Sequence, residues 1–376
     1  MGFPSADIIN NIIFNKHLNS GRRFILPDNI SQSIEKCLES SNSDINNASH
    51  VLKDQLRGNY SSSKHTEYTN VAVVDAYTIE YLPRYFFIPH IIFRDLALCR
   101  ELVGFGITIR ILDMGSGTGA VSLGVYDLFS NDTFNDYSVD LVAVDKSEAA
   151  LTRQFCLINQ VGFRYDLFHC EALDISDIDK VSQFLKRNKP WDIIISANFI
   201  VELDVHIQKS LIALLSRYLS EFGSLVICEP PQDYAKIIIH NIADVIKDSG
   251  LTVYYPCSAP WSCKPKKVKC WIWRDYDIID PIKPISREDE SIELNSTKLQ
   301  MSLVILNKCN KSILEFFKNN RPDLTWSIVS PKFGGFYEIC PSHKTFYSDK
   351  PYNRGDLVGW REGSNGTVDV VVHERL

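Results

Sequence analysis

Residues Ile111-Leu112-Asp113-Met114-Gly115-Ser116-Gly117-Thr118-Gly119 contain the pattern that decides the fold of this chain. The apolar run 107–112 predicts a short buried strand before the glycines, and the apolar stretch from Ala120 to Phe129 predicts a helix after them. The glycines permit a tight turn and a close approach of the backbone to a ligand. Because a helix N-terminus offers free N–H groups, a strand, a glycine turn and a helix in this order predict a nucleotide-binding crossover.

The bulk composition indicates a globular protein of two or three domains. The 376 residues are 45% hydrophobic and 23% charged. A net charge of −6 argues against a broadly basic nucleic-acid surface. No apolar run has the roughly 18 residues that a membrane span needs, so no membrane association is expected.

The first residues carry no targeting pattern, which predicts a cytoplasmic protein. Residues 1–14 have no basic side chain and include Asp7, which fits neither a signal peptide nor an Arg-rich transit peptide. In that compartment the ten cysteines are expected to be thiols or metal ligands rather than disulfides.

Apolar periodicity divides the chain into three regions. Residues 1–85 predict an N-terminal helical region, residues 86–279 predict alternating strands and helices and hence a parallel sheet, and residues 280–376 predict a small β-rich domain. A hairpin of 251–255 with 268–276 is expected to end the sheet. The strands expected in the last region are 301–306, 326–329, 336–340, 356–360 and 368–372.

Tyrosines near the end of the helical region have two interpretations. They either pack on the next domain or line the mouth of the site. The residues concerned are Tyr77, Tyr81, Arg84 and Tyr85.

Polar residues follow the predicted strands at the edge where a ligand would lie. Asp145 ends the second strand and is placed to accept both hydroxyls of a ribose, with Lys146 beside it. Asp174 follows the third strand and is placed to accept from an adenine amino group. Asn198 ends the fourth strand.

The D-x-G-x-G-x-G turn resembles the first motif of the S-adenosylmethionine (SAM) methyltransferases. This resemblance implies a class I, Rossmann-like α/β fold with SAM as cofactor. The expected SAM-binding residues are Asp113, Gly115, Ser116, Gly117, Gly119, Asp145, Lys146, Asp174 and Asn198. The expected catalytic residues are Asn198, Glu202 and Glu229, with either glutamate as a base.

A cysteine-rich loop spans residues 256–270. Cys257, Cys263 and Cys270 are spaced C-x5-C-x6-C, a clustering that suggests a soft metal site, although three unligated thiols are the alternative. Cys340 is the best candidate for a fourth ligand, and Cys309 is the second. Such a metal site of four cysteines would link the β-rich domain to the methyltransferase domain.

These features together resemble the small-ribosomal-subunit methyltransferase-like family, which includes iron–sulfur assembly factors of mitochondrial ribosomes and bacterial relatives. The matching segments are Asp113–Gly119, 198–203, 225–230, the cysteine loop and 331–341. The resemblance implies that Cys257, Cys263, Cys270 and Cys340 hold a [4Fe–4S] cluster, with zinc as the alternative.

A basic cluster within the cysteine loop suggests a partner. Its residues are Lys264, Lys266, Lys267 and Lys269. They either contact phosphates of small-subunit ribosomal RNA or form a solvated loop. The sequence therefore leaves three functions open: methylation of the small ribosomal subunit, SAM binding by a non-catalytic assembly factor, and methylation of a small molecule or peptide. It identifies neither the methyl acceptor nor the oligomeric state.

Overall fold

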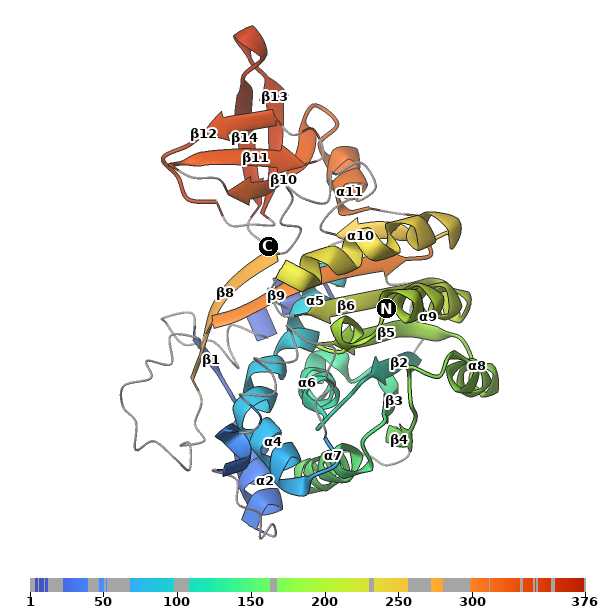
Figure 1. Ribbon diagram of the computed structural model, residues 1–376. Helices are drawn as coiled ribbons and strands as arrows, with labels where there is room; N and C mark the ends of the chain where they lie inside the picture. Colours follow the sequence, from blue (N-terminus) through green and yellow to red (C-terminus); the bar gives the residue numbers. More distant parts are fainter. Residues whose placement is uncertain are drawn as a thin grey trace.

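The computed structural model contains two sheets with helices around the larger one (Figure 1). It describes residues 4–5, 7–9, 11–12, 23–39, 47–50, 52, 68–97, 108–162, 168–229, 233–255, 272–279, 298–310, 312–331, 334–340, 342, 344–352 and 356–374.

Five parallel strands form the centre of the larger sheet and confirm the predicted α/β organisation. They pair in the order β4-β3-β2-β5-β6. Their bounds are β2 Thr108–Met114, β3 Ser138–Asp145, β4 Phe168–Ala172, β5 Trp191–Ala197 and β6 Leu219–Glu229. The helices between and after them are α6 Ala120–Phe129, α7 Glu148–Val161, α8 Ile178–Arg187, α9 Val205–Arg217 and α10 Asp233–Asp248.

The antiparallel strand of this sheet comes from a later segment than predicted. β9 (Lys298–Asn307) pairs antiparallel with β6 on one side and with β7 (Thr252–Tyr255) and β8 (Ile272–Ile279) on the other. The expected hairpin of 251–255 with 268–276 is therefore wrong, and so is the placement of 301–306 in the C-terminal β-rich domain. The reason is burial: residues 303–306 are at most 3% exposed, so both faces of this strand need cover.

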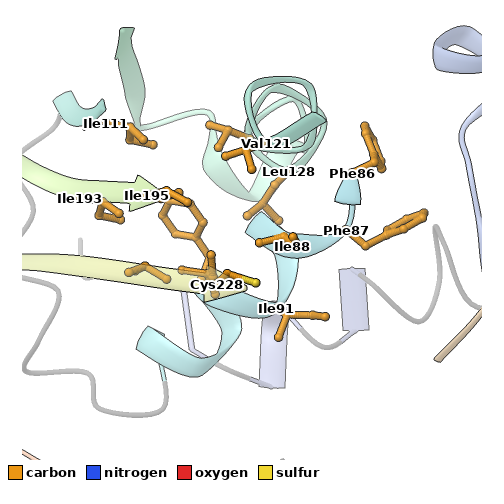
Figure 2. Packing of buried hydrophobic residues seen from close by; sticks show 14 of the residues in the cluster. Phe86, Phe87, Ile88, Ile91, Ile111, Val121, Leu128, Ile193, Ile195 and Cys228 are labelled. Atoms are coloured by element: carbon orange, nitrogen blue, oxygen red, sulfur yellow. The ribbon is translucent and has the colours of Figure 1, made fainter. Parts of the chain in front are cut away.

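Apolar side chains alternate between the two faces of the sheet. Ile193 and Ile195 of β5 pack on one face with Val121 and Leu128 of α6 (Figure 2), while Ile194 packs on the other face. The first face is covered by α6 and α7 and by the N-terminal helices α2 (Asp28–Glu39), α4 (Val71–Tyr85) and α5 (Ile88–Ala97). The predicted helical region is thus part of the main core. A short strand, β1 (Arg23–Ile25), pairs parallel with β8.

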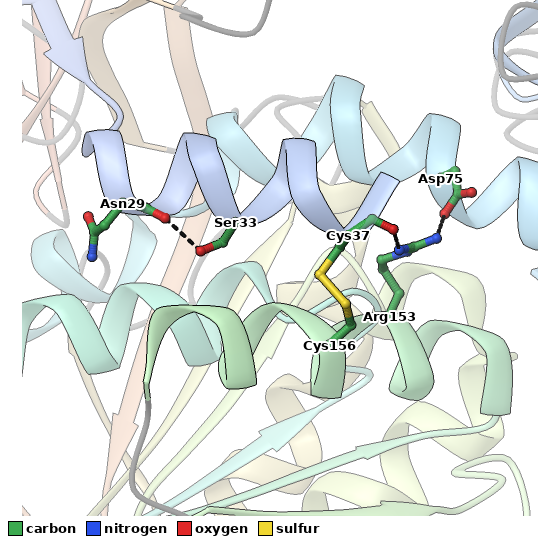
Figure 3. Close-up of a disulfide and its surroundings, with 6 residues drawn as sticks. All are labelled: Asn29, Ser33, Cys37, Asp75, Arg153 and Cys156. Carbon is green, nitrogen blue, oxygen red and sulfur yellow. Dashed lines mark hydrogen bonds and ion pairs between the residues drawn. A yellow bond between two sulfur atoms is a disulfide. The ribbon is translucent and has the colours of Figure 1, made fainter. Parts of the chain in front are cut away.

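Helix α7 is tied to the N-terminal helices by a disulfide and by an arginine (Figure 3). Cys37 of α2 is bonded to Cys156 of α7. Arg153, one turn earlier on α7, donates to the backbone carbonyl of Cys37 and forms an ion pair with Asp75 of α4. The expectation that all cysteines are thiols or ligands is therefore wrong for this pair, because folding brings together two residues 119 positions apart.

The C-terminal region forms a second, antiparallel sheet of the order β12-β11-β10-β13-β14 at one end of the molecule (Figure 1). It has its own small core, which includes Val329, Ile339 and Trp360. The sequence analysis missed β12 and the helix before β10. The bounds are α11 Ile313–Asn320, β10 Thr325–Pro331, β11 Phe336–Cys340, β12 Lys344–Tyr347, β13 Leu357–Glu362 and β14 Val368–Glu374.

The predicted metal site of four cysteines lies mostly outside the described residues. Cys340 ends β11 and is half-buried, whereas Cys257, Cys263 and Cys270 and the lysine cluster Lys264, Lys266, Lys267 and Lys269 fall in undescribed segments. Within the described ranges, no group of three or more His, Cys, Asp or Glu side chains is placed to hold a metal ion. The cluster stays a prediction.

None of the described helices is both long enough and apolar enough to cross a bilayer.

Replacement of Cys37 by Ser is expected to lower the free energy of unfolding by about 2–4 kcal/mol, because the disulfide restricts the unfolded chain. Urea unfolding without reductant measures this difference. Cys170→Ser, a half-buried thiol on β4, is the matched control and should have a much smaller effect. Alkylation of Cys37 in the untreated protein would contradict the disulfide.

Candidate functional site

The glycine turn connects β2 to α6 and lies against the end of β3. The N–H groups of Gly115 and Ser116 both donate to the carbonyl oxygen of Val144, at 2.9 and 3.1 Å. Gly115, Gly117 and Gly119 all have positive φ, at 68°, 52° and 91°. A Cβ on Gly115 would overlap the ring of Phe199, so this position needs glycine for space as well as for conformation.

A buried chain of hydrogen bonds from α6 and α7 supports the glycine turn. The hydroxyl of Ser116 donates to Gln154 Oε1 at 2.9 Å, and Gln154 Nε2 donates to the hydroxyl of Ser122 at 2.8 Å. Ser122 in turn donates to Asp113 Oδ2 at 2.8 Å. Gln154 is fully buried on α7, and sequence reasoning missed it because a glutamine inside a helix carries no local signal.

Asp113 and Asp145 are both held by donors from the chain. Burial raises the pKa of Asp113 to about 7, against the lowering effect of the Ser122 hydrogen bond. Asp145 accepts from the N–H of Gly117 and from the N–H of Ser147, each at 2.8 Å. Burial also raises the pKa of Asp145, which these hydrogen bonds oppose. Asp145 thus stands at the end of β3 directly beside the turn.

A pocket opens above the turn at the carboxyl ends of the parallel strands. The structure brings most of the predicted site residues together on its walls. Those that line it are Asp113, Gly115, Ser116, Gly117, Asp145, Lys146, Asn198 and Glu202.

Three predicted site residues are not on the pocket wall. Gly119 caps the N-terminus of α6. Asp174 is exposed, and its Oδ1 accepts from the N–H and the hydroxyl of Ser176. Glu229 lies 1% exposed behind the wall.

Glu229 holds the turn that follows β5. Its Oε1 accepts from the N–H groups of Phe199 and Val201, at 3.2 and 3.3 Å, next to Asn198, which has a φ of 55°. Burial raises the pKa of Glu229 to about 8, against the lowering effect of its backbone hydrogen bonds, so the folded state favours the neutral carboxyl. This geometry gives Glu229 a positioning role. The base role assigned to it stays a prediction.

Glu202 is the glutamate that faces the pocket. It makes no hydrogen bond or ion pair with any residue that the structure describes. Burial raises its pKa to about 7, which the nearby Lys146 opposes and the nearby Asp145 reinforces. A carboxyl group of this kind exchanges a proton readily near neutral pH.

Tyrosines from the N-terminal region form the remaining wall. Tyr68, Tyr77 and Tyr85 line the pocket, and Ser147 fixes this segment by donating to the carbonyl of Tyr68. Tyr81, which is not on the wall, stacks on Tyr77 with ring centroids 4.9 Å apart. Arg84 lies 5.6 Å from the Tyr81 ring. Two of the four residues suggested for the mouth of the site, Tyr77 and Tyr85, therefore lie there.

The neutral burial of Glu229 predicts a pH dependence of stability. Its pKa in the folded state, about 8, is above the ordinary value of 4.5, so the folded state binds the proton more tightly than the unfolded state. This contribution is complete below about pH 4.5 and is lost as the pH rises toward 8.

Thermal unfolding from pH 5 to 9 tests this dependence by comparing the wild type with Glu229→Gln. The Gln variant keeps an oxygen for both N–H groups and should lose less stability with rising pH. Parallel pH profiles for the two proteins would contradict the neutral state of Glu229.

The comparisons with known proteins returned matches only among solved structures. No family model and no curated protein matches the chain. A SAM-dependent methyltransferase from Clostridium acetobutylicum is 12% identical, with 61% of this chain and 95% of that one covered and a TM-score of 0.36. Magnesium protoporphyrin IX methyltransferase from Synechocystis with bound S-adenosylhomocysteine (SAH) is 10% identical, covers 69% of this chain and 99% of its own, and has a TM-score of 0.35. Similarity at this level carries no functional argument. The strand order and the glycine turn themselves fit the Rossmann-like fold of class I SAM-dependent methyltransferases.

Proposed function

We propose that this chain is a SAM-dependent methyltransferase that acts on a small molecule or a peptide. The observation that carries the proposal is the pocket in which the glycine turn and Asp145 meet Asn198 and Glu202. Ligands of open α/β sheets bind at the carboxyl ends of the strands, which is where these residues lie. One pocket thus combines a glycine turn and an aspartate that suit a nucleotide-like cofactor with polar side chains that suit a methyl acceptor.

The residues at the turn fit SAM. The hydroxyl of Thr118 is buried on the pocket wall and has no hydrogen-bond partner among the described residues, so a ligand group would satisfy it. Each oxygen of Asp145 accepts one hydrogen bond and retains capacity for a ribose hydroxyl. A side chain on Gly117 would enter the pocket toward Tyr77. Glycine keeps this space open.

Methyl transfer from SAM requires little chemical catalysis from the protein. SAM supplies a methyl group that is already activated by its sulfonium. The turn would hold the amino-acid end of SAM and Asp145 the ribose. Asp174 is exposed outside the described pocket wall, and its contact with the adenine amino group stays a prediction from the sequence. Asn198 and Glu202 would orient the acceptor, and Glu202 would accept a proton from it. Positioning and one base are therefore sufficient.

The enclosure of the pocket favours a small acceptor over RNA. Helix α4 and Tyr68 just before it place a tyrosine wall at the pocket. The described walls carry three carboxyl groups but one lysine, Lys146. Phosphates would be repelled by such a surface, since nucleic-acid sites depend on Lys and Arg. The net charge of −6 also favours a small acceptor over RNA.

The more specific role implied by the family resemblance remains a separate proposal. It assigns a [4Fe–4S] cluster to Cys257, Cys263, Cys270 and Cys340, and action on or assembly of the small ribosomal subunit, with or without turnover. Its support is the cysteine spacing and the late Cys340, which ends β11. It is compatible with the SAM site because the two sites share no residue.

Replacement of Asp145 by Ala is expected to weaken SAH binding by about tenfold or more, because two ribose hydrogen bonds to a carboxylate are lost. Isothermal titration calorimetry with SAH measures this. The matched control is Asp179→Ala, an exposed aspartate on α8 outside the pocket, which should bind SAH like the wild type. Failure of the wild type to bind SAH would overturn the proposed function.

Anaerobically purified protein is expected to contain iron and sulfide and to be brown if the cluster proposal holds. Cys257→Ser should then lose the visible absorbance, whereas Cys170→Ser should keep it. Zinc in place of iron would indicate the alternative metal. A metal-free, colourless protein would exclude both.

A further inference from the structure

The three carboxyl groups on the described pocket walls differ in how they are used. Asp113 accepts a hydrogen bond from the hydroxyl of Ser122, and Asp145 accepts from the N–H groups of Gly117 and Ser147. Glu202 has no such donor in the part of the chain that the structure describes. Glu202 is half-buried, and a partly desolvated carboxyl without a donor is unfavourable, so this side chain favours a ligand that carries positive charge or a hydrogen-bond donor.

Tyrosine rings line the same pocket as this carboxyl. They belong to Tyr68, Tyr77 and Tyr85, and Glu202 contributes to raising the pKa of Tyr77. Tyr68 meets Tyr77 edge-on, with ring centroids 5.4 Å apart, so the rings present both edges and faces. Burial and the neighbouring tyrosines raise the pKa of Tyr77 well above its ordinary value, so its hydroxyl stays neutral.

A wall of tyrosine rings beside a carboxylate favours a positively charged ligand over a negatively charged one. Ring faces attract cations, and a carboxylate adds to that attraction. Lys146 is the single cation among the described lining residues, and it is exposed at the mouth. An acceptor bearing a carboxylate or a phosphate would meet three acidic side chains, Asp113, Asp145 and Glu202, and no buried cation among the described lining residues.

We propose that the methyl acceptor is an amine, held as its ammonium form by Glu202 and the wall of Tyr68, Tyr77 and Tyr85. This inference rests on the proposed function and adds the class of acceptor to it. Glu202 follows β5 and Asp145 ends β3, the two strands that flank β2, so both line the same pocket from the two sides of the glycine turn.

In the proposed methyl transfer to an amine, Glu202 accepts the proton that the ammonium must lose. The ammonium gives one proton to the Glu202 carboxylate and becomes a neutral amine with a free lone pair. Desolvation in the pocket lowers the pKa of the ammonium and raises the pKa of Glu202. It opposes the effect of the ion pair, so the gap between the two pKa values narrows. The nitrogen then forms a bond to the methyl carbon as the carbon–sulfur bond breaks, and its electron pair stays on sulfur. The methylated product is an ammonium again, and Glu202 releases its proton to solvent.

The test is the binding of tetramethylammonium to the protein saturated with SAH. SAH carries no sulfonium, so it leaves the cation site to the probe. Saturation-transfer NMR at constant ionic strength should show saturable binding of tetramethylammonium that is about tenfold tighter than that of tert-butanol, a neutral probe of similar shape.

Two pairs of variants locate the site. Glu202→Gln should weaken tetramethylammonium binding several-fold, whereas Glu221→Gln, an exposed glutamate on β6, should not change it. Tyr77→Leu should weaken tetramethylammonium binding, whereas Tyr77→Phe, which keeps the ring, should bind it like the wild type. Retained SAH binding shows that each variant is folded.

The outcomes separate this inference from the proposed function. Loss of SAH binding in the wild type overturns both. Normal SAH binding with equal affinity for tetramethylammonium and tert-butanol overturns the amine acceptor alone, and so does a Glu202→Gln variant that binds tetramethylammonium like the wild type.

Discussion

Helix α7 holds both sides of the pocket, because nearby residues on it bond to three different segments. Gln154 supports the glycine turn through Ser116 and Ser122. Arg153 pairs with Asp75 of α4, the helix that carries Tyr77, and Cys156 is bonded to Cys37 of α2. The glycine turn and the tyrosine wall of the pocket are therefore both held by α7. A shift of α7 would move both, since buried polar contacts of this kind do not stretch gradually.

Burial gives the acidic side chains around the pocket different roles. Asp113 and Glu229 are at most 1% exposed and use their oxygens to hold the turn and the segment after β5. Glu202 faces the pocket instead, and its raised pKa of about 7 follows mainly from desolvation. Asp113 and Glu229 thus act as structural acceptors, whereas Glu202 and Asp145 both face the pocket.

The limits of sequence reasoning appear at β9 and at the disulfide. The apolar run 303–306 predicts a strand, but no local pattern says that it pairs with β6, because Ser224 and Asn307 meet only in the folded sheet. Cys37 and Cys156 likewise come together through the packing of α2 on α7. Gln154 was missed for the same reason, since its partners lie 32 and 38 residues away.

The sequence by itself determined the parallel strands up to β6, the glycine turn and Asp145 at the end of β3. These features follow from local apolar runs and from glycine conformations, which depend on neighbouring residues. Only the tertiary structure decided which glutamate faces the pocket. Glu202 follows β5 and Glu229 ends β6, both at the same edge of the sheet, and the fold buries Glu229 behind the segment that it holds while Glu202 lines the wall. It also decided that tyrosines of the N-terminal region form a wall of the site. That wall depends on contacts between α4 and α7, which no periodicity in either helix encodes.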